Sequence, residues 1–584
     1  MANHQPQYRE KVSSMISWGH WFALFNILLA LVLGSRYLLI NDWPASLAGR
    51  IYAYCSWLGH FSFIVFALYL LILFPITFFI RSQRLLRVIA SIIATCGLTL
   101  LLIDGAVFQR FHLHLNPIVW QLVVNPEQSE LTRDWQLMFI AAPIIFLAEL
   151  LFATWSWQKL RSLNRHHYAR PFVVLFIATF FASHIMYIWA DANFYRPITM
   201  QKSNLPLSYP MTARRFLEKH GLLDSEDYQR RLIQQGEPDA LSLAYPLNEI
   251  TVAPKASGYN LLVITIDNLS SEAVSKAYPA LGNFAQQNIN FTQHYSSGPS
   301  SENGLFGLFY GISSTYLEGV LASRTPSSLL TTLANRHYQF GLFSTDGFKQ
   351  PFYRQALLTD YTIPLQHRQS DSQTVEQWHN WYSQQQNTTQ PWFSWVSLQG
   401  AATSNATEGQ RSQTYQQNSA TTDQQLAAIL NELEQSHAMN NTVVVITGAH
   451  GLSLTPGATS ESRRNVLHVP LVIHWPNTPA QSIDYLTDHQ DIMATIMQRL
   501  LNVTTPSYDY TQGRDLFTTQ GRNNWVTSSE DNHLIITTPT RSIVLNTNGQ
   551  YSSYDVKGRR LHDETPELGL LLQVLTEEKR FIAN

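Results

Sequence analysis

Five long apolar stretches lie within the first ~190 residues, and the rest of the 584-residue chain holds none of comparable length. About 20 consecutive apolar residues cross the hydrocarbon core of a bilayer as one helix, because a helix satisfies all of its backbone polar groups internally. The sequence therefore predicts an α-helical bundle in the membrane, followed by a large soluble region. We place the five spans at about residues 18–40, 56–80, 86–104, 135–157 and 171–190.

The basic residues predict how the spans are oriented, because cytoplasmic loops carry an excess of Lys and Arg. They precede the first span, and they separate the second span from the third and the fourth from the fifth. They are Arg9, Lys11, Arg81, Arg84, Arg87, Lys159, Arg161, Arg165 and Arg170. The loop at 105–134 has no basic excess. Five spans with a cytoplasmic N-terminus place the C-terminal region in a periplasm-like compartment.

Charge and cysteine content exclude two further classes. The formal net charge is −2, so no global field favours a nucleic acid partner. The two cysteines, Cys55 and Cys96, both fall in apolar stretches, so the soluble region forms no disulfide. Polar residues in or near the spans, such as His60 and His184, are explained by helix–helix hydrogen bonds or by a proton pathway.

Three regions follow from this pattern: a transmembrane domain at 1–190, a juxtamembrane linker at 191–245 and a soluble domain at 246–584. Prolines interrupt the first part of the linker. Residues 211–221 then predict a short amphipathic helix that ends at Gly221, with Thr212 or the preceding turn as its cap.

This linker helix carries side chains that suit a lipid. Arg214 and Arg215 provide guanidinium groups for phosphate, and Met211 and Phe216 provide apolar contacts for acyl chains. The segment, including Thr212, is therefore a candidate site for an anionic lipid. An ordinary solvated linker explains the same residues equally well.

Continuous apolar runs in the soluble region predict strands buried on both faces of a parallel sheet. They lie at 260–267, 340–344, 392–398, 442–447 and 471–475. Helical patterns occur between or after them, at 327–336, 423–436 and 490–501. This alternation predicts an open α/β sheet with helices on both faces, and such sheets bind ligands at the carboxyl ends of their strands. The candidate site residues are thus Asp267, the turn at 298–304, Asp346 and residues 448–451.

A family resemblance rests on three of these segments. Residues 440–451 are similar to a "DNTLVIFTSDHG" pattern, residues 468–475 to an "HxVPLxI" strand, and residues 488–495 to the helix after the last core strand. Together they resemble the alkaline phosphatase/sulfatase superfamily. Membrane-anchored members with five spans include phosphoethanolamine transferases and lipoteichoic acid synthases.

The chain resembles one branch of this superfamily over its whole length, the YejM (PbgA) inner-membrane proteins of Gram-negative bacteria. Residues 111–121, 190–200, 205–221 and 578–584 carry that likeness. The resemblance implies an inner-membrane sensor of lipopolysaccharide. Such a sensor restrains degradation of the deacetylase LpxC by the protease FtsH, through the adaptor LapB. It places lipid A at Met211, Thr212, Arg214 and Arg215, and an older interpretation of the family is cardiolipin binding or transport.

The resemblance also implies a hydrolase site, and this sequence departs from the family pattern at one of its positions. Asp267 and His450 match metal ligands, and Ser300 or Ser301 matches the nucleophile, but Ala449 stands where the family has Asp. Losing a carboxylate from a small ligand set should weaken binding of Mg²⁺, Mn²⁺ or Zn²⁺. Asp346 and His468 are possible substitutes, although a turn and a strand edge explain them as well. Three interpretations stay open: an intact enzyme, a weak metal-dependent phosphatase or transferase, and the favoured one, a pseudoenzyme that requires no cofactor.

Overall fold

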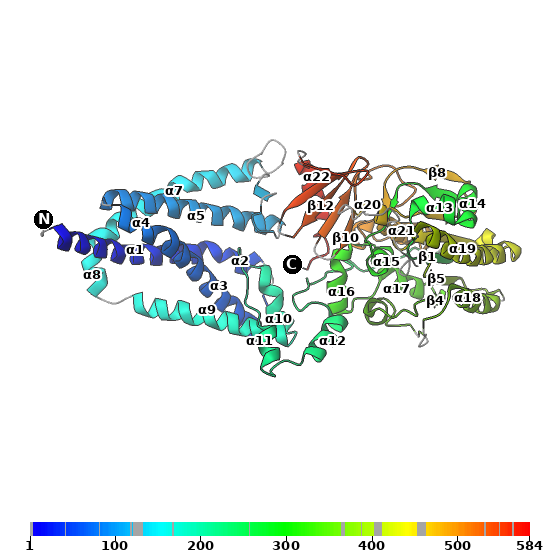
Figure 1. Cartoon of the computed structure of the whole chain (residues 1–584), viewed down its shortest axis with the longest axis horizontal. Coiled ribbons are helices and arrows are strands. Elements are labelled where there is room, and N and C mark those ends of the chain that lie inside the picture. The colour runs from blue at the N-terminus through cyan, green and yellow to red at the C-terminus, as the bar shows by residue number, and fades with distance from the viewer. Residues whose placement is uncertain are drawn as a thin grey trace. The chain divides into compact units, whose positions relative to one another are not determined.

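The computed structural model describes residues 4–40, 43–80, 82–111, 113–116, 119–120, 132–165, 169–255, 257–361, 363, 368–386, 388–401, 411–452, 463–530, 533–547, 549–562 and 566–583. Arg81 and residues 121–131 of the predicted loop at 105–134 lie outside these ranges. The chain forms two compact units (Figure 1). A membrane unit runs to Leu232 and includes Glu237–Ala240, and a sheet unit comprises Ile233–Gly236 and Leu241–Ala583. Most of the predicted linker thus belongs to the membrane unit.

Five helices in the membrane unit are long and apolar enough to cross a bilayer, which confirms the predicted number of spans. A sixth candidate, the bent pair Ser301–Tyr310 and Ser314–Ser323, belongs to the core of the sheet unit. The helices of the first two spans are α1 (His4–Gly34), α2 (Arg36–Ile40), α3 (Leu47–Leu68), a π-helical turn (Tyr69–Leu73) and α4 (Phe74–Phe79). The others are α5 (Gln83–Phe111), α7 (Thr132–Gln158), α8 (Leu160–Arg165) and α9 (Ala169–Ala192).

The third span continues past Asp104, where the prediction ended it. Asp104 is buried, and α5 runs on to Phe111. The hydroxyl of Tyr37 donates to Asp104 Oδ2 at 2.5 Å, and the amide of Leu115 donates to Oδ1 at 2.6 Å. A carboxylate with such partners can stay inside a helical bundle, so its charge does not mark the end of the helix.

The linker contains α10 (Arg196–Thr199), a 3₁₀ turn (Met200–Ser203), α11 (Arg214–Lys219) and α12 (Ser225–Gln235). The predicted helix at 211–221 is therefore shorter than expected. Its N-cap is Ala213 and makes no side-chain cap hydrogen bond, so the predicted cap at Thr212 is wrong. Gly221 follows the helix with a φ of +69°, a left-handed conformation that favours glycine and stops a helix.

A seven-stranded sheet forms the centre of the other unit, in the order β4-β5-β1-β6-β7-β2-β8. Its strands are β1 (Asn260–Ile266), β2 (Ile289–Phe291), β4 (Gln339–Ser344), β5 (Trp392–Leu398), β6 (Thr442–Gly448), β7 (Leu471–His474) and β8 (Gln481–Ile483). Strands β4, β5, β1 and β6 are parallel as predicted, but β7 is antiparallel to both of its neighbours. A continuous apolar run predicts burial on both faces and leaves strand direction open. The sheet is consequently mixed.

Alternate residues of the central strands enter two different cores. Leu261 and Val263 of β1 join one hydrophobic cluster, and Leu262 and Ile264 join the other. Helices cover both faces, as predicted. The helices of this unit are α13 (Val274–Ala277), α14 (Pro279–Gln287), α15 (Ser301–Tyr310), α16 (Leu317–Ser323), α17 (Ser328–Asn335), α18 (Asp371–Gln385), α19 (Arg411–Gln435), α20 (Arg464–Leu467), α21 (His489–Thr495) and α22 (Leu568–Glu577).

Helix α19 begins twelve residues before the predicted start at Asp423. Its first three turns are rich in Ser, Gln and Thr, so they lack the apolar periodicity on which the prediction rested. The Asp423 carboxylate instead accepts hydrogen bonds from the amides of Ala280 and Leu281 in the first turn of α14. The residue predicted to open one helix therefore caps another.

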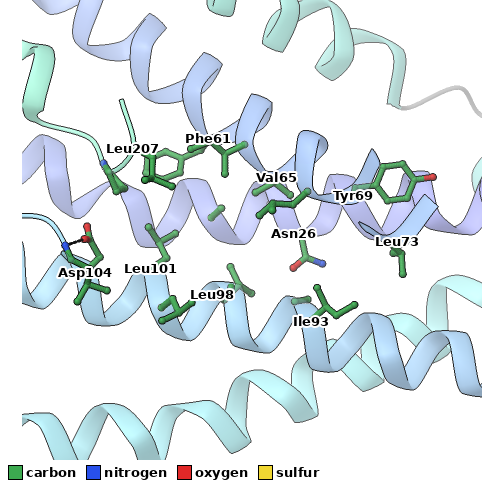
Figure 2. A pocket seen from close by; sticks show the side chains of 18 of the residues that line it. Asn26, Phe61, Val65, Tyr69, Leu73, Ile93, Leu98, Leu101, Asp104 and Leu207 are labelled. Atoms are coloured by element: carbon green, nitrogen blue, oxygen red, sulfur yellow. Dashed lines mark hydrogen bonds between the residues drawn. The ribbon is translucent and has the colours of Figure 1, made fainter. Parts of the chain in front are cut away.

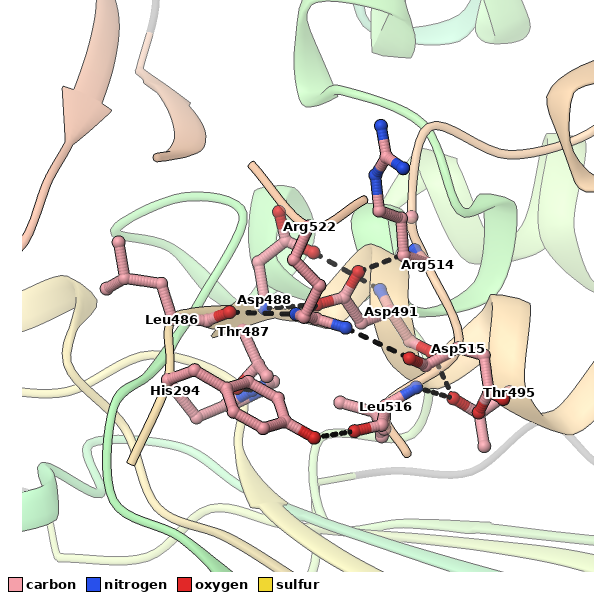
Figure 3. A network of polar contacts seen from close by, with 12 residues as sticks. His294, Leu486, Thr487, Asp488, Asp491, Thr495, Arg514, Asp515, Leu516 and Arg522 are labelled. Atoms are coloured by element: carbon pink, nitrogen blue, oxygen red, sulfur yellow. Dashed lines mark hydrogen bonds and ion pairs between the residues drawn. The ribbon is translucent and has the colours of Figure 1, made fainter. Parts of the chain in front are cut away.

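A polar network fixes the start of α21 (Figure 3). Asp488 caps the helix by accepting from the amide of Asp491 at 3.2 Å. The carboxylate of Asp491 accepts from the amide of Arg514 at 2.6 Å and is paired with Arg522. Two buried carboxylates are tolerated here because amide donors and a guanidinium group neutralise them. Helix α21 packs on α15, so this network also positions α15.

A second sheet, which the sequence did not predict, follows the first. Its five antiparallel strands are β10 (Val526–Glu530), β11 (His533–Thr537), β12 (Arg541–Asn546), β13 (Tyr551–Asp555) and β14 (Arg560–Leu561). Buried Ser and Thr residues make up much of these strands, for example Thr527, Ser528 and Ser529. This holds for β10 and β13, whereas β11 and β12 contain runs of three apolar residues, 534–536 and 543–545, that the prediction overlooked. The remaining pair, β3 (His294–Tyr295) and β9 (Thr487–Asp488), is parallel.

Candidate functional site

The hydrolase-like site lies at the carboxyl ends of β1 and β6. These strands are parallel neighbours, and Ile266 is in register with Gly448. The amide of Ala449 donates to Ile266 O at 2.9 Å. Asp267 and His450, which follow the two strands, are thereby held at the same edge of the sheet, as predicted.

The Asp267 carboxyl is strongly perturbed at this edge. Burial raises its pKa to about 6, while the charge of His450 and a hydrogen bond with Ser301 oppose this rise. The carboxylates of Asp346 and Asp371 raise it further. Asp267 Oδ1 is buried and has no hydrogen-bond partner among the described residues. A perturbed carboxyl beside a hydroxyl and an imidazole is typical of a functional site.

The two candidate serines have different roles. The hydroxyl of Ser300 accepts a hydrogen bond from the amide of Asn303 at 3.2 Å and so caps α15. Ser301 is the first residue of that helix and lies close enough to Asp267 for its hydroxyl to lower the pKa of that carboxyl. The structure therefore brings Ser301, and not Ser300, to the acidic residue.

Gly304 lets α15 approach the loop after β6. A β-carbon at this position would lie 2.0 Å from the carbonyl oxygen of Ala449 and 2.6 Å from the hydroxyl of Ser296. That hydroxyl donates to the same carbonyl at 2.6 Å. The helix and the loop are thus locked through the backbone of Ala449, while its methyl side chain supplies no ligand.

The possible substitute ligands serve other contacts. Asp346 Oδ1 accepts from the hydroxyl of Ser344 at 2.5 Å and from the amide of Phe348 at 2.8 Å. The Nε2 atom of His468 lies 2.9 Å from Thr292 O. A turn and a strand edge thus account for both residues.

The superfamily implies a divalent metal at this edge of the sheet. Among the described residues, no group of three or more His, Cys, Asp or Glu side chains is arranged to hold one. The Nδ1 atom of His450 lies 2.8 Å from Gly451 O, and Ala449 offers no donor. The residues present therefore do not fit the metal set of an intact hydrolase.

Sequence reasoning missed Tyr353 and Asp371 near this site, whereas Glu302 lies in the predicted turn at 298–304. Burial raises the pKa of Tyr353, and the charges of Asp267, Asp346 and Glu302 add to this effect. Burial also raises the pKa of Glu302, in the first turn of α15. Asp371 accepts from Thr345 and Thr422 hydroxyls and from two backbone amides. The Ser-x-x-Gln capping box that precedes α18 is the only local signal that marks Asp371.

The second candidate site is the linker segment of the membrane unit. Met211, Thr212, Arg215 and Phe216 are all exposed, with Met211 at 56% and Phe216 at 59%. Leu207 and Tyr209, just before them, are exposed at 74% and 85%. An exposed cluster of large apolar side chains beside a basic residue is typical of a membrane-interface contact.

Arg214 differs from the other four predicted residues because its guanidinium is engaged within the unit. It makes two hydrogen bonds of 2.8 Å to the carboxylate of Asp191, at the end of α9. It also lies over the ring of Tyr228, 5.1 Å from the ring centroid. Asp191 is buried. The prediction missed it because its position, just after the last apolar residue of a span, gives no sign of a pairing with Arg214.

Two histidines of the spans hold the linker backbone. The Nε2 atom of His60 lies 2.6 Å from Pro206 O, and the amide of Met211 donates to His184 Nδ1 at 3.1 Å. These hydrogen bonds join a span to the linker, whereas the prediction was of hydrogen bonds between helices. They fix the linker beside the middle of α3 and the last turns of α9.

Comparisons with known proteins cover the whole chain. Residues 4–252 match a family model described as a domain of unknown function, DUF3413, and residues 260–503 match one described as Sulfatase. An uncharacterized protein of Haemophilus influenzae is 41% identical over 582 residues, 98% of this chain and 97% of its own. Among solved structures, a protein in the alkaline phosphatase superfamily from Vibrio parahaemolyticus is 16% identical, with a TM-score of 0.46, and covers 57% of this chain and 91% of its own. Inner membrane protein YejM of Salmonella typhimurium is 57% identical over 589 residues, which span all of both chains. The chain therefore belongs to the YejM family of inner membrane proteins, with a sulfatase-like α/β domain after its five spans.

Proposed function

We propose that this protein senses lipopolysaccharide at the periplasmic face of the inner membrane and regulates lipopolysaccharide synthesis. The observation that carries the proposal is the exposed linker segment at the ends of the spans, where Arg215 lies among Met211, Thr212 and Phe216. Lipid A presents phosphates and acyl chains together, and a guanidinium fork beside apolar side chains is complementary to both. The incomplete metal set at Ala449 fits a domain that serves as a platform instead of an efficient hydrolase.

Arg214 gives this proposal a two-state element. In the structure its guanidinium binds Asp191, and a lipid phosphate is the natural competitor for the same donors. A ligand shifts such an equilibrium only by its differential affinity for the two states. Lipid A would therefore act by exchanging the Asp191 contact for a phosphate contact.

The regulatory output is proposed to be cytoplasmic, through the adaptor LapB, so that FtsH degrades less LpxC. The basic segments at 81–87 and 158–170, which include α8, are the proposed contact surfaces. The same charges also serve to orient the spans, so this part of the proposal needs its own test. Pull-down of LapB by full-length protein with charge-reversed Arg161 would provide it, and unchanged capture would move the contact elsewhere.

Lipid binding by Arg215→Ala tests the sensor proposal directly. Full-length protein in detergent is titrated with lipopolysaccharide. A hydrogen bond to a charged group contributes ~1.5–3 kcal/mol, so losing the contact of Arg215 with a phosphate should weaken the affinity for lipopolysaccharide roughly 10- to 100-fold. Arg230→Ala is the matched control, because Arg230 is an exposed arginine of the neighbouring helix α12. Equal affinity in both variants would refute the proposal, and equal competition by cardiolipin vesicles would make cardiolipin the ligand.

A second candidate function, a metal-dependent phosphatase or headgroup transferase for envelope lipids, is favoured by one observation. Ser301, at the start of α15, and His450 both lie close enough to Asp267 to lower the pKa of its carboxyl. The test is lipopolysaccharide abundance in cells that depend on a Ser301→Ala, His450→Ala protein, with the Ser300 cap left intact. Normal abundance at normal protein level supports the regulator, and lost control moves the enzyme to first place.

A further inference from the structure

The membrane unit contains a cavity of about 600 Å³ between α1, α3 and α5. Its wall is almost entirely aliphatic and aromatic, and includes Phe61, Val65, Leu98 and Leu101 (Figure 2). Asn26 is the polar residue midway along it, and its side-chain amide already donates to Phe22 O and to the carboxylate of Glu149. The volume lies within the ~300–1,000 Å³ of ordinary ligand pockets.

The cavity is elongated along the spans. Its lining on α5 runs from Ala90 to Asp104, which at 1.5 Å per residue is about 21 Å. One leaflet of a bilayer core is about 15 Å thick, so one extended lipid chain fits this length. Water is a poor occupant of the middle of the cavity, where the wall is aliphatic and aromatic and the Asn26 amide is already bonded; the free polar atoms, such as the Tyr69 hydroxyl, lie at the ends.

The two ends of the cavity differ chemically. Asp104 marks one end and Tyr69 and Leu73 mark the other, as Figure 2 shows. The Asp104 carboxylate receives hydrogen bonds from Tyr37 and from the amide of Leu115, and His114 Nδ1 lies 2.8 Å away. A carboxylate has about four acceptor positions, so one remains for a further donor.

Charge selects the kind of headgroup at the Asp104 end. No Lys or Arg is found among the described residues that line the cavity. The titratable partner of Asp104 is His114, whose Nδ1 lies 2.8 Å from Oδ2, so the pair is negative when the imidazole is neutral and balanced when it is protonated. Neither state attracts an anionic headgroup, whereas the remaining acceptor position of Asp104 can accept from an ammonium group. The polar end is thus complementary to an amine-bearing, zwitterionic headgroup and unsuited to a lipid with net negative charge.

We propose that this cavity binds one acyl chain of a zwitterionic, amine-bearing phospholipid, with its headgroup at Asp104. The lining includes Pro206 and Leu207 of the linker but none of residues 211–216, which are proposed for lipid A. The two sites are therefore adjacent, and they have opposite charge preferences. The bundle carries this lipid as a resident part of its packing, in place of side chains that would otherwise fill the space between α1, α3 and α5.

Gly97 provides a direct test. It lines the cavity, and a β-carbon at this position would meet no atom within 4 Å. Gly97→Phe therefore fills the cavity without forcing neighbours apart. Ile92→Phe is the matched control, because Ile92 lies on the same helix, is 47% exposed and is outside the cavity lining.

The full-length protein is reconstituted in nanodiscs of equal phosphatidylethanolamine and phosphatidylglycerol. It is then released into mild detergent, and retained lipid is counted by native mass spectrometry. Wild type and Ile92→Phe should each retain one phosphatidylethanolamine, and Gly97→Phe should retain at least tenfold less. Thermal unfolding checks that each variant is folded, and Ala94→Leu replaces Gly97→Phe if that variant is not.

Three results would overturn the proposal: equal retention in the folded cavity-filling variant, retained phosphatidylglycerol, or no retained lipid in the wild type. Lipopolysaccharide titration of Gly97→Phe separates this site from the linker segment. Unchanged lipopolysaccharide affinity together with lost phosphatidylethanolamine supports two independent sites.

Discussion

Replacing Gly304 by Ala should destabilise the sheet unit by about 3 kcal/mol. The new methyl group would lie 2.0 Å from Ala449 O and 2.6 Å from the Ser296 hydroxyl, so one of these groups has to move. The carbonyl belongs to a backbone that is fixed by the bond from Ala449 N to Ile266 O. Overpacking costs ~1–3 kcal/mol and a broken buried hydrogen bond adds ~1–3 kcal/mol, while the gain in helix propensity returns only about 1 kcal/mol.

Gly282→Ala is the matched control for this variant. Gly282 is also inside a helix, α14, but its β-carbon would meet only Val274 atoms at 3.9 and 4.0 Å, which is ordinary contact. This substitution should therefore stabilise the unit by about 0.5–1 kcal/mol through backbone propensity alone. The two glycine substitutions thus have opposite expected signs.

Thermal unfolding of the full-length protein in detergent measures both effects. One kcal/mol shifts Tm by roughly 2–4 °C in domains of 150–250 residues, and by less in a larger unit. Gly304→Ala should lower Tm by several degrees, while Gly282→Ala raises it slightly. If Gly304→Ala is neutral or stabilising, the lock between α15 and the loop after β6 does not exist as described.

Further changes test other contacts of the two units. Arg214→Met should lower the stability measured by thermal unfolding by about 2–3 kcal/mol, because Asp191, which is 5% exposed, loses its ion-pair partner and solvent screens this pair only partly. Adding Asp191→Asn should recover part of the lost stability, and no recovery would show that the pair does not stabilise the unit. Ser300→Ala should cost about 1 kcal/mol through loss of a helix cap, and a neutral result would deny the cap. Burial lowers the pKa of His489 to about 4, so the unfolded chain takes up a proton first as pH falls below 6.5, and stability should drop by up to ~3 kcal/mol between pH 6.5 and 4. A His489→Gln protein should lack that pH-dependent component in Tm measurements, and an unchanged profile would assign it to another group.

The sequence predicted those features that depend on apolar pattern. Five spans and the core strands at 260–267 and 442–447 were found because burial on all sides demands apolar residues. Features that depend on polar partners were missed or misplaced. The end of α5 was set at Asp104 because its partner Tyr37 is 67 residues away. Strands β10 and β13 were missed because their buried residues include Ser and Thr, and the short apolar runs of β11 and β12 were overlooked.

The candidate sites show the same division. Adjacent arginines in one short helix have different surroundings, since Arg214 binds Asp191 while Arg215 is exposed. The sequence pattern assigned both arginines to a lipid, because it does not show that Arg214 pairs with a carboxylate 23 residues earlier in the chain. Likewise, Ser300 and Ser301 were equivalent in sequence, and only the geometry of α15 separates the cap from the residue that contacts Asp267.

Ala449→Asp tests whether a carboxylate at this position is enough for the edge of the sheet to bind a divalent metal ion. Ala449 is fully buried, so a carboxylate there is desolvated close to Asp267, and without metal the variant should be less stable by several kcal/mol. A divalent ion that bound the restored set would stabilise the folded state by about 2.7 kcal/mol at 100 times its Kd. We therefore expect Ala449→Asp to have a lower Tm than the wild type. Mg²⁺, Mn²⁺ or Zn²⁺ should raise the Tm of this variant and should leave unchanged the Tm of a variant that also carries Asp267→Asn. Because the fold uses the backbone of residue 449, through Ser296 and Gly304, the absence of a carboxylate from its side chain leaves these contacts intact. A metal-dependent rise of equal size in the wild type would contradict this reasoning, because it would mean that the described residues already form a metal site.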